Sequence, residues 1–344
     1  MLPTFSKHFR YTSPLAAVAA ILAGAACGDS GGSTGGTGGG NVTTTTSSSS
    51  SSSTSASSSS GTGGSCDGFG DGTVCPANGT VQPFAGAAMA IDSVTAHIVD
   101  ETGQPAGGVT VFICGTDICS NPGKTGPDGS VTLVNNTSAM KNPAFKFGNS
   151  LTEAEIAIPL TTATTDFTPI GTGKLATAKL PAAGVPLTPG TDATSGDVTL
   201  SVPAGGSVSF DILHATCESQ VFRAVNVPLT NLGPVLDPVT VNGTPADFKL
   251  FYGVAPAQTA ICPAARVTVA LPHKIKTPND LDWVAGAAVE FWIMTTDSGQ
   301  QFAPYGGWAK MSDGTVSADG TTVSTNDGAN QGFVALENFA IRLK

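Results

Sequence analysis

Cysteines are the residues of this sequence that indicate chemistry most directly. Seven occur, and six of them follow residue 65, where they could form three disulfide bonds. No two have the C-x₂-C spacing of a zinc site, which favours disulfides over metal binding. Fifteen pairings are formally open, and proximity along the chain suggests three of them: Cys66–Cys75, Cys114–Cys119 and, for the remainder, Cys217–Cys262.

Two carboxylates inside the short Cys66–Cys75 loop could contribute to a calcium site. Asp67 and Asp71 are four residues apart and are flanked by glycines. A complete site needs about six oxygen ligands, and the Asp-x-Asp-x-Asp-Gly series of a calcium loop does not occur. A surface turn closed by the disulfide is the alternative. No other metal and no cofactor is expected.

Aromatic residues gather near the end of the sequence, where all three tryptophans occur after residue 282. Trp292 lies in an apolar stretch and is expected in a core. Tyr305 and Trp308 flank Gly306 and Gly307 in an expected loop, so they could present flat rings to a sugar or a partner protein. Packing of both rings against the end of a β-sandwich is the alternative.

The sequence holds no arrangement typical of an enzyme. No Ser-His-Asp signature and no phosphate-binding glycine loop occurs. The stretch Gly28–Gly32 reads Gly-Asp-Ser-Gly-Gly, similar to the nucleophile loop of trypsin-type proteases, but it lies in a segment too flexible to position a histidine and an aspartate. His97, His214 and His273 lack metal-ligand spacing and are expected to be structural.

The N-terminus has the pattern of an export signal. Lys7 and Arg10 precede an apolar run, Leu15–Ala26, that is too short to span a bilayer but fits a signal peptide. The small residues before Cys27 resemble a bacterial lipoprotein signal, which implies lipidation of that cysteine as the new N-terminus. Gly24 stands where that pattern usually has Leu. The alternative is cleavage at the A-x-A site Ala23-Gly24-Ala25.

Residues 27–65 are expected to form a flexible tether, because a chain of Gly, Ser and Thr cannot bury apolar surface. The r.m.s. reach of such a linker is roughly 35 Å, enough to hold a domain away from a membrane surface. The net charge is −10, from 15 basic and 25 acidic residues, and the sequence has no basic surplus for phosphates. We therefore expect no nucleic-acid partner.

The rest of the chain predicts an all-β fold of tandem β-sandwich modules. Short β-branched runs alternate with Asp-Gly and Asn-Gly turn signals, and no long helical period is uninterrupted by Pro or Gly. The expected strands are 94–99, 109–114, 131–134, 198–202, 207–213, 221–227, 248–252, 267–271 and 289–294. The expected turns are Asp128-Gly129, Asn242-Gly243, Asp313-Gly314, Asp319-Gly320 and Asp327-Gly328.

The first module carries a family resemblance. A strand that ends at Asp100, a Gly103-Gln104-Pro105 turn and a Thr125-x-x-Asp128-Gly129 turn resemble a carboxypeptidase regulatory-like domain. That resemblance implies a small transthyretin-like β-sandwich without catalysis of its own. The zinc-binding His-x-x-Glu of true carboxypeptidases does not occur.

These observations divide the chain into expected segments. They are a signal peptide (1–26), a lipid-anchored linker (27–65), a disulfide loop (66–85), the carboxypeptidase regulatory-like sandwich (86–160) and a second β-sandwich region (161–344), with a break near 265 if it holds two subdomains. The last 62 residues are similar to the tail of uncharacterised bacterial surface lipoproteins, a similarity that names no activity.

The expected protein is exported and held by lipid in the outer membrane or at the cell surface, or else periplasmic or secreted. We expect a non-catalytic module for adhesion, scaffolding or binding of a glycan or envelope protein. The alternative is a secreted or surface hydrolase or glycan-processing enzyme with its site in the C-terminal β region.

Overall fold

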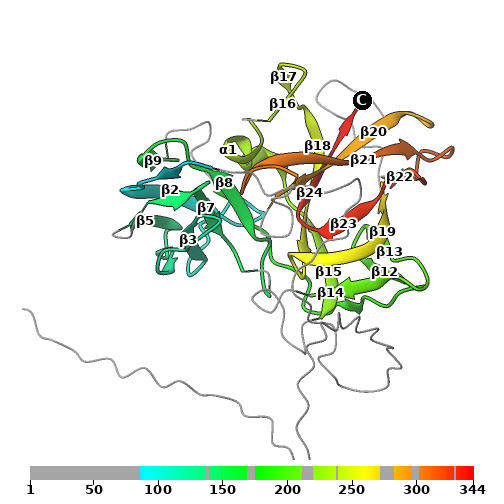
Figure 1. The fold of residues 1–344 in the computed structure, drawn as a ribbon, viewed down its shortest axis with the longest axis horizontal. Coiled ribbons are helices and arrows are strands. Elements are labelled where there is room, and N and C mark those ends of the chain that lie inside the picture. Colours follow the sequence, from blue (N-terminus) through cyan, green and yellow to red (C-terminus); the bar gives the residue numbers. More distant parts are fainter. Residues whose placement is uncertain are drawn as a thin grey trace, which may run out of the picture. The chain divides into compact units, whose positions relative to one another are not determined.

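The two β-rich regions are seen in a computed structural model of the chain (Figure 1). It describes residues 86–135, 139–149, 151–168, 175–210, 220–237, 239–271, 283–295, 302–328 and 331–344. All of them belong to one unit, Thr62–Lys344. Within these ranges, no helix is long and apolar enough to cross a membrane.

The first region contains ten short strands that form two four-stranded sheets and a small ladder. One sheet has the order β10-β2-β5 with β9 also paired to β2, the other has the order β4-β3-β7-β8, and β1 pairs with β6. The strands are β1 (Ala88–Met89), β2 (Ser93–Val99), β3 (Thr110–Cys114), β4 (Gly123–Lys124), β5 (Ser130–Val134), β6 (Met140–Lys141), β7 (Ala144–Phe147), β8 (Ile156–Pro159), β9 (Thr164–Asp166) and β10 (Leu175–Ala176).

Alternation of side chains builds the core between these sheets. Val94, Ala96 and Ile98 of β2 are fully buried, whereas the residues between them are half-exposed. The turns follow from side-chain chemistry. Asp100 ends β2 because its Oδ1 accepts hydrogen bonds from the backbone N–H groups of Thr102 and Gln104, each at 2.9 Å.

The second region is built around a long antiparallel sheet that curls on itself. Its path of ten strands has the order β11-β15-β18-β24-β20-β21-β22-β19-β13-β12, and β14 and β23 pair with β19 beside it. The strands are β11 (Val185–Pro186), β12 (Asp192–Ser195), β13 (Val198–Ser201), β14 (Ser207–Ser209), β15 (Val221–Asn226), β18 (Phe248–Ala255), β19 (Thr259–Ala270), β20 (Ala288–Met294), β21 (Trp308–Val316), β22 (Thr322–Thr325), β23 (Phe333–Leu336) and β24 (Phe339–Leu343).

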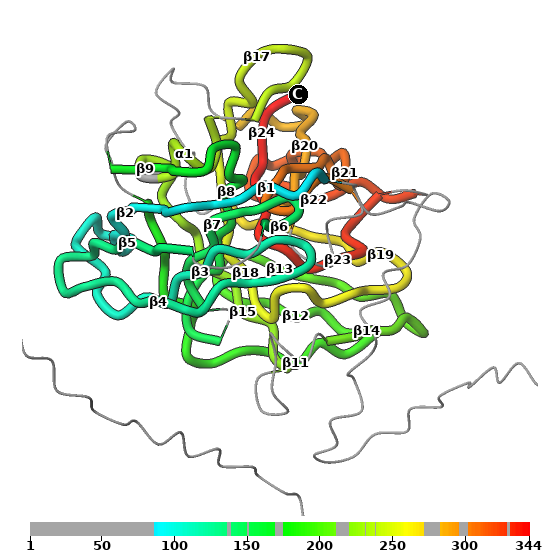
Figure 2. The backbone as a smooth tube through the Cα atoms, turned by 60° about the vertical axis from the view of Figure 1, so that its left-hand side comes forward, coloured from blue at the N-terminus to red at the C-terminus, as the bar shows by residue number. Residues whose placement is uncertain are grey.

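The two ends of this path meet, so the sheet is nearly closed into a barrel. Ala224 of β15 donates its backbone N–H to the hydroxyl of Ser195 in β12, at 3.0 Å, where a backbone ladder would otherwise continue. The strand β19 can be followed as a long yellow tube in Figure 2. Its first half pairs with β14 and β23, and its second half pairs with β13 and β22.

Between β15 and β18 the chain leaves the barrel and forms four small elements. A single 3₁₀ turn and a short helix come first, and a hairpin follows. These elements are η2 (Leu229–Asn231), α1 (Gly233–Leu236), β16 (Thr240–Val241) and β17 (Thr244–Pro245).

Large aromatic side chains fill the barrel. Phe333 and Phe339 meet edge to face with ring centroids 5.3 Å apart, and Phe291 packs against both. Gly314 of β21 lies over this group: a Cβ there would be 2.5 Å from Cε2 of Phe291 and 2.5 Å from the backbone oxygen of Ser324. The close approach of two strands at this point therefore requires glycine.

Hydrogen bonds connect the first region to the barrel. The Ala157 backbone N–H of β8 contacts Sδ of Met294 in β20 at 3.4 Å. The guanidinium of Arg223 in β15 donates to the backbone oxygen of Leu151 at 2.6 Å. The Asn338 side-chain amide donates to the backbone oxygen of Glu155. Both cores are thus bridged by buried polar contacts.

The all-β prediction is confirmed. Each predicted strand has a counterpart among the described residues, except that 211–213 of the strand predicted at 207–213 lie outside them. The region expected to form a second β-sandwich, residues 161–344, contains the barrel-like sheet described above. The predicted boundary at residue 160 precedes β9 and β10, both of which pair with β2, and residue 265 lies inside β19. The turn predicted at Asp313-Gly314 is wrong, because both residues are extended within β21.

Candidate binding face on strands β20, β21 and β24

The aromatic pair expected to form an exposed recognition loop does not do so. Tyr305 is only 2% exposed and belongs to the core of the first region. The next residue explains this, since a Cβ on Gly306 would lie 3.2 Å from side-chain or backbone atoms of Ala144 and Pro159. The loop therefore packs on β7 and β8. The prediction that Tyr305 is an exposed ligand contact is wrong.

Trp308 is partly buried and is held from two sides. Its indole N–H donates to the backbone oxygen of Val235 at 3.2 Å. Its ring lies 5.2 Å from that of Phe248 and 5.9 Å from that of Phe251. These contacts leave Trp308 in a packing role, which was the alternative to the exposed pair.

The predicted disulfide between Cys114 and Cys119 is present. Cys262 is also disulfide-bonded, but Cys217, the partner proposed for it, lies outside the described residues. The same holds for Cys27, for Cys66 and Cys75, and for the calcium candidates Asp67 and Asp71. The described part of the chain contains no group of three or more His, Cys, Asp and Glu side chains that could hold a metal ion.

A charged group absent from the sequence-based expectations lies on the outer surface of the barrel, centred on Glu290. In β20 the side chains of Val289 and Phe291 point into the barrel, so Glu290 and Trp292 lie on the other face. Glu290 is only 8% exposed. Its Oε2 accepts from Nε1 of Trp292 at 3.1 Å and from Nη1 of Arg342 at 2.7 Å.

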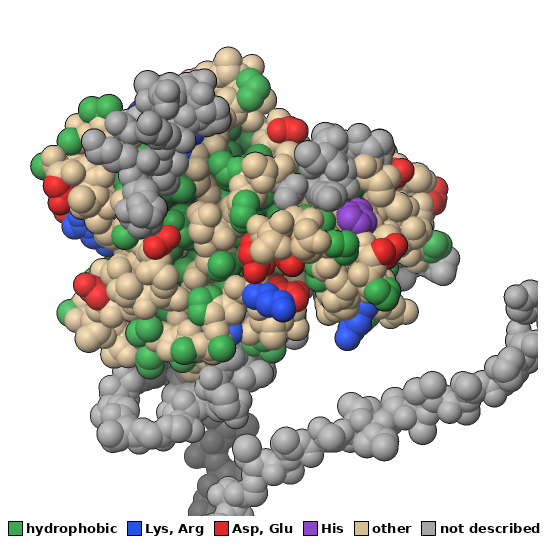
Figure 3. All heavy atoms as spheres, turned by 180° about the vertical axis from the view of Figure 1, so that it is seen from behind, with side chains coloured by type: hydrophobic (Ala, Val, Ile, Leu, Met, Phe, Trp, Pro, Cys, Tyr) green, Lys and Arg blue, Asp and Glu red, His purple; other side chains and the backbone are tan. Residues whose placement is uncertain are grey.

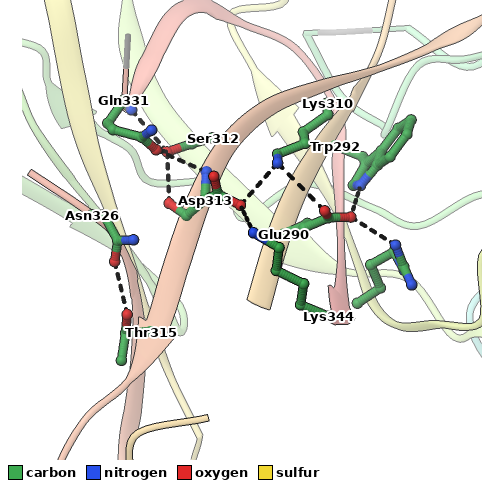
Figure 4. Close-up of polar contacts among 11 residues, drawn as sticks. Glu290, Trp292, Lys310, Ser312, Asp313, Thr315, Asn326, Gln331 and Lys344 are labelled. Carbon is green, nitrogen blue, oxygen red and sulfur yellow. Dashed lines mark hydrogen bonds and ion pairs between the residues drawn. The ribbon is translucent and has the colours of Figure 1, made fainter. Parts of the chain in front are cut away.

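Lys310 joins Glu290 to a second carboxylate. Its Nζ lies 3.4 Å from Oε1 of Glu290 and 2.9 Å from Oδ1 of Asp313, and Lys344 approaches the same Asp313 oxygen at 3.2 Å. Figure 4 shows the lysine between the two carboxylates. Strand register places these groups together, because Glu290 pairs directly with Asp313 on one side and with Arg342 on the other. We call these five charged residues and Trp292 the Glu290 network.

Neutral side chains hold Asp313 in position. The Gln331 amide oxygen accepts from the Asp313 backbone N–H at 2.8 Å and from the Ser312 hydroxyl at 2.9 Å. The same hydroxyl oxygen accepts from the Gly332 backbone N–H at 3.0 Å. On the next outward position of β21, Thr315 donates to Asn326 at 2.8 Å (Figure 4).

Lowered pKa values keep the Glu290 and Asp313 carboxylates ionised at neutral pH. Burial alone would raise the pKa of Glu290, but the Trp292 N–H, Lys310 and Arg342 together hold it below its usual value. The hydrogen bond from Lys310 is the largest effect on Asp313 and lowers its pKa, and the same bond raises the pKa of Lys310. Both carboxylates thus remain ionised and cannot supply a proton near pH 7.

Aromatic and hydroxyl side chains extend the surface on either side of the network. Trp292 lies edge-on to Phe248, with ring centroids 6.3 Å apart. On the other side, strand register aligns five outward hydroxyl residues on five neighbouring strands, with Oγ–Oγ distances of 2.9 Å within two of the pairs. They are Thr315, Ser324, Thr268, Thr199 and Thr194. The outer face of the barrel is therefore polar, with one concentration of charge.

On the face shown in Figure 3, uncharged atoms dominate the described residues, one group of acidic side chains lies near the centre, and basic side chains do not gather into a patch. No family model, no curated protein and no solved structure matches this chain.

The sequence did contain one signal for the Glu290 network: a glutamate inside the apolar run Val-Glu-Phe-Trp-Ile at 289–293 must lie on the face opposite the core.

Proposed function

We propose that this protein is an exported, lipid-anchored cell-envelope protein that acts as a non-catalytic binding module. The export signal, the lipoprotein-like Cys27 and the Gly/Ser/Thr tether support the anchor. The carboxypeptidase regulatory-like pattern supports an accessory role for the first region. The Glu290 network is the observation that carries the binding role.

A glycan fits the chemistry of this network best. The side chains of Lys310 and Lys344 are 36% and 52% exposed, and both ammonium groups contact Asp313. The partly buried Trp292 indole donates to Glu290 beside them, and Thr315 follows as an exposed hydroxyl residue on β21. Sugars present both apolar ring faces and many hydroxyls, which aromatic rings and charge-assisted hydrogen bonds recognise. Among the described residues Lys310 makes two ion-pair contacts and Lys344 makes one, fewer than the three N–H donors of an ammonium group, which leaves donors for a ligand.

The fixed charges favour binding over hydrolysis at this site. A glycoside hydrolase needs one carboxylic acid with a raised pKa to protonate the leaving oxygen. Glu290 and Asp313 both contact the ammonium group of Lys310, but the pKa of each carboxylate is lowered. This pair would therefore position a sugar without cleaving it.

Binding is tested with the lipidated protein in detergent and a panel of soluble oligosaccharides, read by calorimetry and by tryptophan fluorescence. Lys344→Ala is compared with Arg266→Ala, since the two side chains are 52% and 50% exposed and only Lys344 belongs to the network. We expect Lys344→Ala and Trp292→Ala to weaken binding by about tenfold and Arg266→Ala to leave it unchanged. Absence of binding to every sugar, or equal loss in all variants, would refute the glycan-binding role.

A further inference from the structure

The strand β5 forms an open edge of the first region's sheet. The Ile98 N–H donates to the backbone oxygen of Gly129, and the Asn135 N–H donates to the backbone oxygen of Asp92. In residues 129–135 the backbone N–H and C=O groups of the odd-numbered residues therefore point toward β2. Alternate residues of a strand direct their backbone groups to opposite sides. The N–H and C=O groups of Thr132 and Val134 therefore point away from β2, and among the described residues no backbone hydrogen bond to them occurs.

This edge lacks the features that usually prevent strand pairing. Proteins protect edges with charged residues, proline or bulges. The segment Ser130–Val134 reads Ser-Val-Thr-Leu-Val, without charge or proline, and pairs with β2 in unbroken register. Val134 is 64% exposed. By contrast, β11 contains Pro186, and β12 lies against β15.

Packing of the neighbouring strand does not close the edge. β4 passes near β5, because Gly123 allows the Leu133 side chain to sit over its backbone, but the ladder of β4 is with β3. Leu133 points toward the core, whereas Thr132 and Val134 are exposed. The backbone groups on the open side thus belong to two exposed residues.

We propose that β5 pairs antiparallel with β5 of a second copy of this chain, across a two-fold axis at Leu133. In that register Thr132 lies opposite Val134 of the second copy, and the relation is repeated by symmetry. Each pair exchanges two N–H to C=O hydrogen bonds, so the four open groups of each edge, eight in total, are satisfied. An uncharged edge suits a second copy in particular, because no like charges are brought together despite the chain's charge of −10.

The contact between the two β5 strands is small, so the dimer forms only where copies of the chain are concentrated. A five-residue edge buries much less than the roughly 1,200 Å² of a stable complex, so copies in dilute solution remain apart. A lipid anchor confines copies to one surface and raises their effective concentration. This step rests on the proposed function, and it places the dimer at the membrane.

The test uses the full lipidated protein, tagged with donor or acceptor fluorophores at the C-terminus and reconstituted in phospholipid vesicles. Energy transfer is measured against surface density. Thr132→Pro removes an open-edge N–H while sparing the β2 ladder, and Val134→Lys adds a charge to the edge. Val284→Lys is the matched control, because Val284 is 65% exposed and lies outside the edge.

We expect the two edge variants to raise the half-saturating surface density by about tenfold or more, with Val284→Lys changing it less than about twofold. Thermal unfolding confirms that each variant is folded. No density-dependent transfer in the wild type, or equal loss with Val284→Lys, would overturn the proposal. Failure of the anchor is seen separately as missing acyl mass at Cys27, and self-association is then measured by sedimentation at high concentration with the same variants.

Discussion

Lys146 and Glu155 form an ion pair with Nζ and Oε1 2.9 Å apart, and their side chains are only 9% and 7% exposed. The pair lies where the first region meets the barrel. Asn338 donates its side-chain amide to the backbone oxygen of Glu155, and its own Oδ1 accepts from the Val254 N–H at 2.9 Å. A buried charge pair thus stands beside the polar contacts that join the two cores.

Removing one partner of this pair is predicted to be costly. Lys146→Met removes the ammonium that contacts the Glu155 carboxylate in a buried site, and we expect a loss of about 3–5 kcal/mol in the free energy of unfolding. The double variant Lys146→Met/Glu155→Leu should recover much of it, since both charges of this pair are removed. Urea denaturation measures all three proteins, with the exposed Lys141→Met as control. A single variant as stable as that control would contradict this assignment.

The all-β fold could be predicted because its signals are local. Alternation in the segment 198–202 and the Asp-Gly and Asn-Gly pairs before β5 and β17 depend on neighbours in sequence. Pairing between strands that are distant in the sequence has no comparable local signal in the sequence. The parallel pairing of β9 and β10 with β2, and the closure of β12 against β15, arise from packing of whole sheets.

The site residues show the same division. Tyr305 in a Gly-rich loop has the pattern of an exposed residue, and only contact with β7 and β8 buries it. Asp313-Gly314 has the pattern of a turn, but it lies within β21, where Gly314 packs beside Phe291 on the inner face of the barrel. Glu290 could be placed on an outer face from its neighbours, yet its partners come from two other strands.

Gly314 is predicted to be intolerant of any side chain. Gly314→Ala places a methyl group against Phe291 and the backbone of Ser324, and overpacking of this kind costs about 1–3 kcal/mol. Gly233→Ala is the control, because the nearest atoms to a Cβ there belong to the Asp237 carboxylate, at 3.2 Å or more, and no backbone or aromatic atom is closer. The denaturant midpoint should fall further for Gly314→Ala than for Gly233→Ala. Equal midpoints would show that the barrel wall yields at this point.

The disulfide between Cys114 and Cys119 closes a very short loop, with a sequence separation of 5. Loop-closure entropy predicts a contribution of about 2 kcal/mol for so small a ring. The variant Cys114→Ala/Cys119→Ala should therefore unfold at lower denaturant concentration while retaining its β-sheet circular dichroism. A loss near zero would mean that strain in the folded loop offsets the entropy, contrary to this prediction.

The turn after β21 predicts a pH-dependent stability. Hydrogen bonds from the Ser317 hydroxyl and from Thr321 lower the pKa of Asp319 from 3.8 to about 2. A lowered pKa in the folded state contributes stability above the unfolded value, and that contribution is lost as the pH falls through about 2. Asp319→Asn should thus melt below the wild type at pH 6, with the difference closing between pH 4 and pH 2. A difference independent of pH would exclude the charge as its cause.

The intact mass of the protein purified from its own host membranes tests the central proposal, an anchored and disulfide-bonded binding module, most directly. The sample is measured with and without reduction and alkylation. We predict a chain that begins at Cys27 with an acyl adduct, and six further thiols that alkylate only after reduction. A chain that begins after an A-x-A site, without lipid and with a free thiol at Cys27, would contradict the anchored module and identify a released protein.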